Sequence, residues 1–68
     1  MENRVKKYRE EAGITQEGLA QQAGVSRQSI ISIEKGQYVP TTILALKISK
    51  LLKAPVEDLF VLEKKDWK

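Results

Sequence analysis

The 68-residue chain contains no cysteine and no histidine. These two absences exclude a disulfide framework, a zinc site of the usual Cys/His type, and catalysis by a cysteine or a histidine. Apolar runs are also short, and none approaches the length of a membrane span or a signal peptide. We therefore expect a cytoplasmic protein, from a cell without a nucleus, that is not an enzyme, holds no metal or cofactor and folds by packing alone.

The residues that are present have a globular balance, with 41% hydrophobic and 31% charged. A chain this short buries only about 60% of its unfolded surface, so residues 1–68 have room for one domain. The positive charge is unevenly placed: residues 1–53 hold nine Lys/Arg against five Asp/Glu, and residues 54–68 hold three against four. A basic body suggests an anionic partner, although an ordinary solvated surface explains the charge equally well.

The spacing of apolar residues predicts helices along the whole chain. Val5, Tyr8 and Ala12 recur at helical intervals and predict a first helix over residues 3–12, ended by Gly13. Further periodic or capped segments predict helices over residues 16–23, 27–35, 42–52 and 56–60. No region is rich in β-favouring residues. The predicted fold class is therefore all-α, with four helices and a final helical turn as a short fifth.

The segment Thr15–Gly36 has the pattern of two short helices that meet at Gly24. Helices that cross at about 90–120° over a tight turn need a small residue where they approach and a residue that tolerates positive φ in the turn. Ala20 supplies the first and Gly24 the second. Apolar residues in register complete the pattern: Leu19, Ala23, Val25, Ile30 and Ile33. The sequence therefore predicts a helix-turn-helix unit over about 15–36.

Two opposite charges fall on the inward faces of these helices. On a wheel of about 100° per residue, Arg9 lies about 40° from Val5, and Glu34 lies about 40° from Ile30. A charge that points towards the core needs a partner. We therefore predict a structural ion pair between Arg9 and Glu34 that joins the first helix to the third.

The stretch ITQEGLAQQAGVSRQSIISIEKGQYVPTTILALKISKLL resembles the helix-turn-helix domains of the phage repressor and Cro type, in particular the short regulators of the Xre family. The resemblance extends from about Arg4 to Phe60. It implies a sequence-specific protein that binds double-stranded DNA and regulates transcription, as a repressor that blocks a promoter. It also implies that the helix over about 27–35 lies in the major groove, while the preceding helix crosses the backbone. Arg9 and Glu34 match an ion pair of the phage repressors.

The same resemblance assigns DNA contacts residue by residue. The base-contacting positions are Arg27, Gln28 and Ser32. The phosphate-contacting positions are Gln16, Ser29, Tyr38, Thr41 and Thr42, and Lys35 and Gln37 could add backbone contacts nearby. Arg27 could donate two hydrogen bonds to guanine and Gln28 could pair with adenine, each discriminating by about 1 to 3 kcal/mol. Outside this motif Arg27 and Gln28 would be ordinary solvated residues, and Tyr38 could instead pack within its loop.

Two residues depart from the pattern of the family. Gly18 stands where such domains usually have Glu, and a glycine within a helix costs about 0.8 to 1 kcal/mol relative to alanine. We expect Gly18→Ala to be stabilising unless the backbone is closely approached there. Ile31 lies about 100° from the core centre, where a polar residue is usual. It would contact either a thymine methyl group or the flank of the core, and we favour the methyl group.

The C-terminal end carries more apolar residues than a small core needs. The excess consists of Leu59, Phe60, Val61, Leu62 and Trp67. Regulators with this unit commonly bind as two-fold dimers to half-sites about one DNA turn apart. We predict a homodimer on a palindromic operator, with the tail over residues 61–68 as the dimerisation segment and Val61 and Leu62 as a candidate strand. The alternative is that these residues close the core of a monomer.

A second hypothesis concerns the function of the same tail. The protein could be a DNA-binding antitoxin or another subunit of a larger complex, with its tail bound to a different protein. We expect no effector domain, because residues 1–68 have room for only the DNA-binding domain. Any signal would therefore act through the dimer end, through a partner protein, or through the abundance of the regulator.

Overall fold

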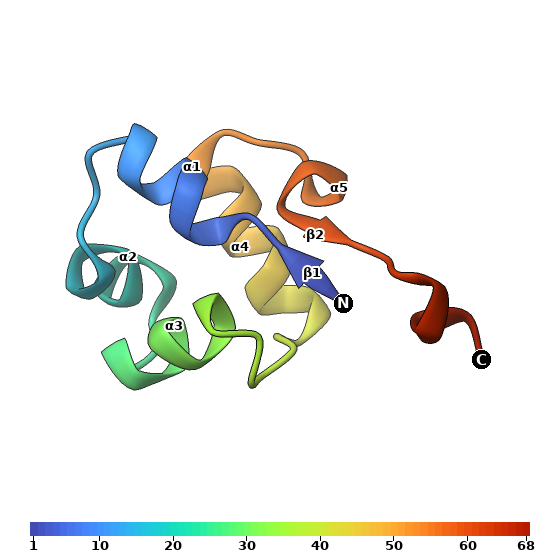
Figure 1. The fold of residues 1–68 in the computed structure, drawn as a ribbon. Helices are drawn as coiled ribbons and strands as arrows, with labels where there is room; N and C mark the ends of the chain where they lie inside the picture. The colour runs from blue at the N-terminus through green and yellow to red at the C-terminus, as the bar shows by residue number, and fades with distance from the viewer.

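Five α-helices account for most of residues 1–68, all of which the computed structural model describes (Figure 1). The helices are α1 Val5–Glu11, α2 Gln16–Ala23, α3 Arg27–Glu34, α4 Thr42–Leu52 and α5 Val56–Leu59. Two short strands, β1 Glu2–Asn3 and β2 Phe60–Val61, and a 3₁₀-helix, η1 Lys64–Trp67, complete the chain. The predicted class is confirmed. None of the helices combines the length and apolar character needed to cross a lipid bilayer.

Side-chain caps fix where α2, α3 and α4 begin. The capping residues are Thr15, Ser26 and Thr41, and each hydroxyl accepts a hydrogen bond from the backbone nitrogen three residues ahead, at 2.9, 3.2 and 3.2 Å. Each cap satisfies an amide that the first helical turn leaves without a partner. The predicted bounds of α2 and α4 are confirmed, because these start signals are local in the sequence.

The turn between α2 and α3 depends on Gly24. This residue has a φ of 74°, in the left-handed region that glycine adopts without a steric penalty. Its backbone N–H donates to the carbonyl oxygens of Ala20 and Gln21 in the last turn of α2. Lys53 ends α4 with a φ of 55°, which is uncommon for a residue with a side chain and was not predicted.

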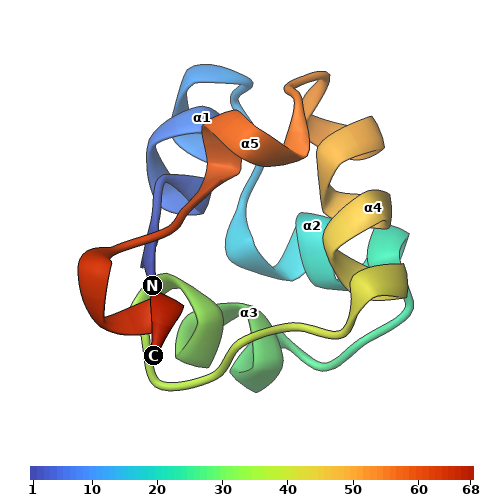
Figure 2. The same ribbon diagram turned by 90° about the vertical axis from the view of Figure 1, so that its right-hand side faces the viewer.

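One cluster of eleven buried hydrophobic residues forms the core. Its completely enclosed members come from every part of the chain: Val5, Leu19, Ile30, Ile33, Ile48 and Leu59. Figure 2 shows α5 beside α1 at the end of the molecule away from α3. Helices α1 and α5 therefore close the core at one end of the molecule, and α3 lies at the other end.

The start of the first helix is one correction to the prediction. Asn3 was expected inside this helix, but it belongs to β1, which pairs antiparallel with β2. In this register Glu2 is opposite Val61, and Asn3 is opposite Phe60. The Asn3 amide also donates to the carbonyl oxygen of Ile33 at 2.8 Å, so it caps the end of α3. A partner thirty residues away decides this conformation, and local periodicity does not reveal it.

The predicted C-terminal strand exists, but its position and its partner differ. It spans Phe60–Val61 instead of Val61 and Leu62, and it pairs with β1 of the same chain instead of lying at a dimer interface. Leu59 is 0% exposed, so it belongs to the core and cannot contact a second protomer. The strand pairing places Leu59 there, because the backbone nitrogen of Arg4 donates to the Leu59 carbonyl oxygen at 2.8 Å.

Gly18 is the third residue of α2, and the space around it permits a test. A Cβ atom added there would lie 3.1 Å from the Thr15 hydroxyl oxygen and 3.6 Å from the Ile14 methyl group. The first contact is tight, but Thr15 is exposed and its side chain can shift by a few tenths of an ångström. We expect Gly18→Ala to raise the free energy of unfolding by about 0.3 to 1 kcal/mol, because alanine loses less backbone entropy on folding.

Urea denaturation of Gly18→Ala, with Gly24→Ala as the matched control, measures this effect. The control should be destabilised, because a Cβ atom at a φ of 74° is strained. A loss of stability in Gly18→Ala itself would mean that the Thr15 cap cannot adjust.

Candidate nucleic-acid interface

The outward face of α3 carries the side chains that were predicted to contact bases. Ile30 and Ile33 point into the core and are completely buried, which fixes the rotation of the helix about its axis. Arg27 and Gln28 are exposed. Burial of one face of α3 thus presents the opposite face to solvent.

Ser32 and Ile31 lie at the margin of this face, and both are half-buried. The side-chain nitrogen of Gln28 donates to the Ser32 hydroxyl oxygen at 3.3 Å, one helical turn away. This bond restrains the Gln28 amide and makes Ser32 a support for it as well as a candidate contact. Part of Ile31 faces solvent, so both contacts considered for it are sterically open.

The predicted phosphate-contacting residues surround α3, and most of them are exposed. The exposed ones are Lys35, Gln37, Tyr38, Thr41 and Thr42, in the loop after α3 and at the start of α4. Ser29 is half-buried, and its hydroxyl lies 3.1 Å from the Ser26 hydroxyl within the first turn of α3. The N-termini of α2 and α4 leave backbone N–H groups that favour phosphate oxygens.

Gln16 has a structural partner that the sequence did not indicate. Its side-chain nitrogen donates to Glu34 Oε1 at 3.1 Å, which ties the start of α2 to the end of α3. Gln16 also lines a polar hollow of about 560 Å³ together with Arg9, Thr15, Glu17 and Arg27. The start of α2 therefore lies next to Arg27. Glu17 places a negative charge there. This charge interacts favourably with the dipole of α2, but it would reduce the attraction of the α2 N-terminus for a phosphate.

The predicted pair of Arg9 and Glu34 lies in the interior, with side chains that are 10% and 4% exposed. Arg9 Nε donates to Glu34 Oε2 at 2.7 Å and Nη2 donates to Oε1 at 3.4 Å. Arg9 Nη1 donates to the backbone carbonyl oxygen of Ile14 at 2.8 Å. The hydrogen bond to Glu34 raises the pKa of Arg9 further above its usual range, so the guanidinium remains charged. With Gln16, these residues join α1, α2 and α3 through one buried network.

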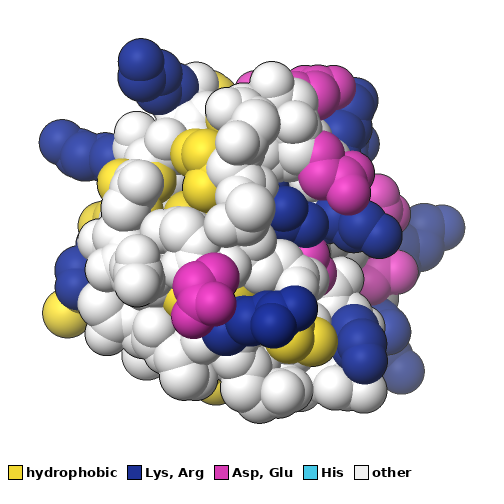
Figure 3. Space-filling view, turned by 90° about the vertical axis from the view of Figure 1, so that its left-hand side faces the viewer, with side chains coloured by type: hydrophobic (Ala, Val, Ile, Leu, Met, Phe, Trp, Pro, Cys, Tyr) yellow, Lys and Arg dark blue, Asp and Glu magenta, His cyan; other side chains and the backbone are white.

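The face opposite the C-terminal segment mixes charges of both signs with polar atoms (Figure 3). Its hydrophobic patches are small and separate.

Among the residues predicted for a dimer interface, Leu62 and Trp67 are exposed, whereas Phe60 and Val61 are half-buried. The structure adds three exposed hydrophobic residues that the sequence analysis missed: Val39, Ile43 and Leu46. The helical period could have identified the two in α4 as exposed. Ile43 and Leu46 lie about 100° and 160° from Leu44 on the helical wheel, outside the inward stripe.

Comparison with known proteins identifies the family. A family model described as helix-turn-helix matches residues 5–59, which is most of the chain. The chain belongs to this Xre-like helix-turn-helix family. Similar proteins are named as HTH-type transcriptional regulators, and this chain is accordingly a DNA-binding transcriptional regulator.

Two relatives show the extent of the similarity in sequence. An uncharacterized HTH-type transcriptional regulator of Methanocaldococcus jannaschii is 51% identical over 63 residues, which cover 93% of this chain and 96% of that protein. The uncharacterized HTH-type transcriptional regulator YgzD of Bacillus subtilis is 47% identical over 66 residues, covering 97% of this chain and 100% of that protein.

Two solved structures share the fold of this helix-turn-helix protein. The restriction-modification controller protein C.AhdI of Aeromonas hydrophila has a TM-score of 0.75 and 28% identity, over 82% of this chain and 85% of that chain. A complex of the SinR and SinI proteins contains a chain with a TM-score of 0.76 and 29% identity. That match covers 93% of this chain and 67% of the other.

Proposed function

We propose that the protein is a repressor that binds a palindromic DNA operator as a homodimer, with α3 of each protomer in the major groove of one half-site. Arg27 and Gln28 read bases, and Ser32 and Ile31 complete the base-reading face. Gln16, Ser29 and the segment from Lys35 to Thr42 contact phosphates on either side.

One observation carries this proposal: a rigidly oriented reading face on α3. The inward residues Ile30 and Ile33 are completely buried, and the capped start of α3 and the Asn3 amide hold its two ends. The buried network of Arg9, Glu34 and Gln16 then fixes α2 relative to α3. A reading helix must be held in place before it binds, because base contacts discriminate only when their geometry is maintained.

The proposal of a dimer follows from the size of this face. A single module of this kind buries about 600 to 1,000 Å² on DNA, which is small for specific binding. A two-fold dimer doubles the contacts and places its half-sites about one helical turn apart.

Selection from random DNA duplexes tests the proposal. We expect a palindromic consensus whose half-sites are about 10 base pairs apart, centre to centre. Binding to that consensus should weaken as salt rises, with a logarithmic slope of about 0.9 for each phosphate contacted. Weak and uniform binding to every sequence would contradict sequence-specific regulation.

A variant of Lys35 tests the phosphate contacts separately. Lys35 is exposed at the end of α3 and forms no ion pair in the structure. We expect Lys35→Ala to weaken binding to all sequences by a similar factor and to lower the salt slope by about 1 per protomer. Lys53→Ala, at the far end of α4, is the matched control and should leave both quantities unchanged. An unchanged slope in Lys35→Ala would remove this residue from the interface.

A second function, as an antitoxin or as a subunit that binds another protein, is favoured by the exposed hydrophobic residues near the C-terminal segment. A toxin-like gene beside the gene for this protein would support that function. Co-expression and co-purification with the product of that gene is the direct experiment. A stable complex with it, without a palindromic consensus, would favour this alternative.

A further inference from the structure

The segment Leu62–Lys68 projects from the body of the molecule and holds a tryptophan in solvent. Figure 1 shows it leaving on the side where β1 and β2 lie, and Figure 2 looks onto that side. Trp67 is 76% exposed and Leu62 is 57% exposed. Both are among the six large hydrophobic residues that the chain leaves exposed.

The end of this segment is an ordered turn. The backbone nitrogen of Glu63 donates to Asp66 Oδ2 at 2.8 Å, and this bond lowers the pKa of Asp66. The Met1 amino group lies 3.3 Å from Asp66 Oδ1 and 3.0 Å from Glu63 Oε1, so the turn is also tied to the body. Trp67 is thus held outward by a structured element.

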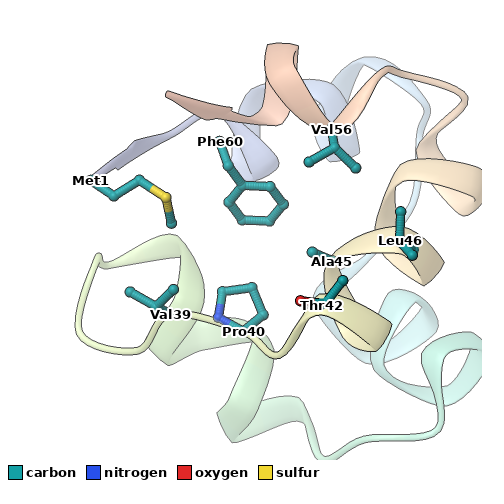
Figure 4. Close-up of a pocket in the computed structure, with 8 residues that line it drawn as sticks. All are labelled: Met1, Val39, Pro40, Thr42, Ala45, Leu46, Val56 and Phe60. Carbon is teal, nitrogen blue, oxygen red and sulfur yellow. The ribbon is translucent and has the colours of Figure 1, made fainter. Parts of the chain in front are cut away.

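The same side of the molecule contains an apolar hollow of about 220 Å³ (Figure 4). Eight residues line it: Met1, Val39, Pro40, Thr42, Ala45, Leu46, Val56 and Phe60. They come from α4, from the α5–β2 corner, from the loop before α4 and, for Met1, from the N-terminus of the chain. An apolar cavity of about 150 Å³ holds a benzene molecule, so this hollow suits a larger ring system such as an indole. Trp67 of the same chain does not line it.

We propose that Trp67 of each protomer fills this hollow in a second copy of the chain. The interface of a two-fold dimer is self-complementary, because the same patch forms both of its sides. A projecting aromatic side chain and an apolar hollow on one side of the molecule meet this requirement, and the contact occurs twice. The inference rests on the homodimer proposed above and specifies how it is held together.

Charge favours a second copy as the occupant. Residues 54–68 carry three Lys against four Asp/Glu, and no charged side chain lines the hollow, so a projecting segment that enters the hollow of a second copy meets little repulsion there.

The available surface also suits a dimer. A stable interface needs about 800 Å² from each partner. The whole accessible surface is 4759 Å², so this requirement is about one sixth of it. Four of the six exposed large hydrophobic residues lie in the hollow or on the projecting segment: Val39, Leu46, Leu62 and Trp67. An aromatic anchor in a pocket is the usual centre of such an interface.

The hollow adjoins the loop that was assigned to phosphate contacts. Val39, Pro40 and Thr42 line it, and Tyr38 and Thr41 lie directly beside them in the chain. Filling the hollow with the partner's indole would pack against this loop and restrain it.

Trp67 is the only tryptophan, so its fluorescence reports the contact directly. We expect its emission to shift to shorter wavelength as the protein concentration rises through the range of dimer formation measured by sedimentation. Trp67→Ala should raise the dissociation constant of the dimer about a hundredfold, because both copies of an aromatic anchor are lost. Lys68→Ala is the matched control and should leave the dissociation constant unchanged.

A mixing experiment distinguishes insertion of Trp67 into the hollow of the partner from insertion into the hollow of its own chain. Ala45→Phe fills the hollow but keeps Trp67, whereas Trp67→Ala keeps the hollow. Each variant alone should dimerise weakly. An equal mixture should form a heterodimer about tenfold tighter than either homodimer, because one of the two contacts is restored. Circular dichroism checks the fold, and Leu46→Glu replaces Ala45→Phe if that variant is unfolded.

The outcomes separate this contact from the proposed function. A dimer in which Trp67 stays solvent-exposed, and which Trp67→Ala does not weaken, overturns the contact but leaves the dimer standing. A monomer whose tryptophan is shielded at every concentration overturns insertion into the partner, since Trp67 then fills its own hollow. A monomer with exposed Trp67 overturns both the contact and the dimer, while the selected DNA consensus still decides whether the protein binds specifically.

Discussion

Replacing Arg9 with leucine is expected to lower the free energy of unfolding by about 3 to 5 kcal/mol. The substitution removes a guanidinium that donates to Glu34 and to the carbonyl oxygen of Ile14. The Glu34 side chain is only 4% exposed, so its charge would remain buried with Gln16 as its sole side-chain partner. An unpaired buried carboxylate is costly, whereas the intact pair need not be stabilising relative to an apolar pair.

Thermal denaturation followed by circular dichroism measures this loss, and each kcal/mol should lower the melting temperature by about 4 to 8 °C in a domain of this size. Lys7→Leu is the control on the same helix, because Lys7 is exposed and forms no ion pair. The double variant Arg9→Leu with Glu34→Leu should recover much of the stability, since it leaves no buried charge. An Arg9→Leu protein that melts like the parent would contradict the buried pair as described.

Replacing Arg27 with alanine is expected to cost about 2 to 6 kcal/mol of specific binding free energy in a dimer, because one bidentate contact of about 1 to 3 kcal/mol is lost in each half-site. Arg27 is exposed at the first position of α3, beside the start of α2, so it can reach a base without displacing any core residue. Titration of the selected consensus and of a random duplex at one salt concentration measures the effect.

Specificity is the decisive part of the Arg27 measurement. Binding to the consensus should weaken far more than binding to the random duplex, and selection with the variant should lose its preference at one base pair of each half-site. Arg4→Ala removes an exposed arginine at the start of α1 and is the matched control. Equal losses on both duplexes would reassign Arg27 from a base to a phosphate.

Local patterns predicted the helices of the reading unit well, because local caps and one glycine turn determine where these helices begin and end. Thr15, Ser26 and Thr41 cap through bonds to residues only three positions away, and Gly24 supplies a turn that depends on its own φ. The pair of Arg9 and Glu34 was also predictable. The helical period places both side chains inward whatever else surrounds them, and buried charges of opposite sign pair.

Contacts between distant segments were less accessible to prediction. Asn3 looked like the first turn of a helix, because nothing near it in the sequence shows that its amide caps α3. Gln16 was predicted only as a phosphate contact, because its hydrogen bond to Glu34 joins residues eighteen positions apart and local patterns do not reveal it. Leu59 looked like an excess apolar residue, but the pairing of β1 with β2 places it inside the core.

The sequence by itself therefore determined the all-α class, the helix-turn-helix unit over about 15–36 and the outward placement of Arg27 and Gln28, since each depends on period, caps and one turn. Only the tertiary structure decided which apolar residues remain outside. It buried Leu59, left Val39 and Leu46 around an apolar hollow, and placed Trp67 in solvent on the same side. The physical reason is that hydrophobicity drives a side chain out of water without specifying its partner, and the partner depends on how all the segments pack together.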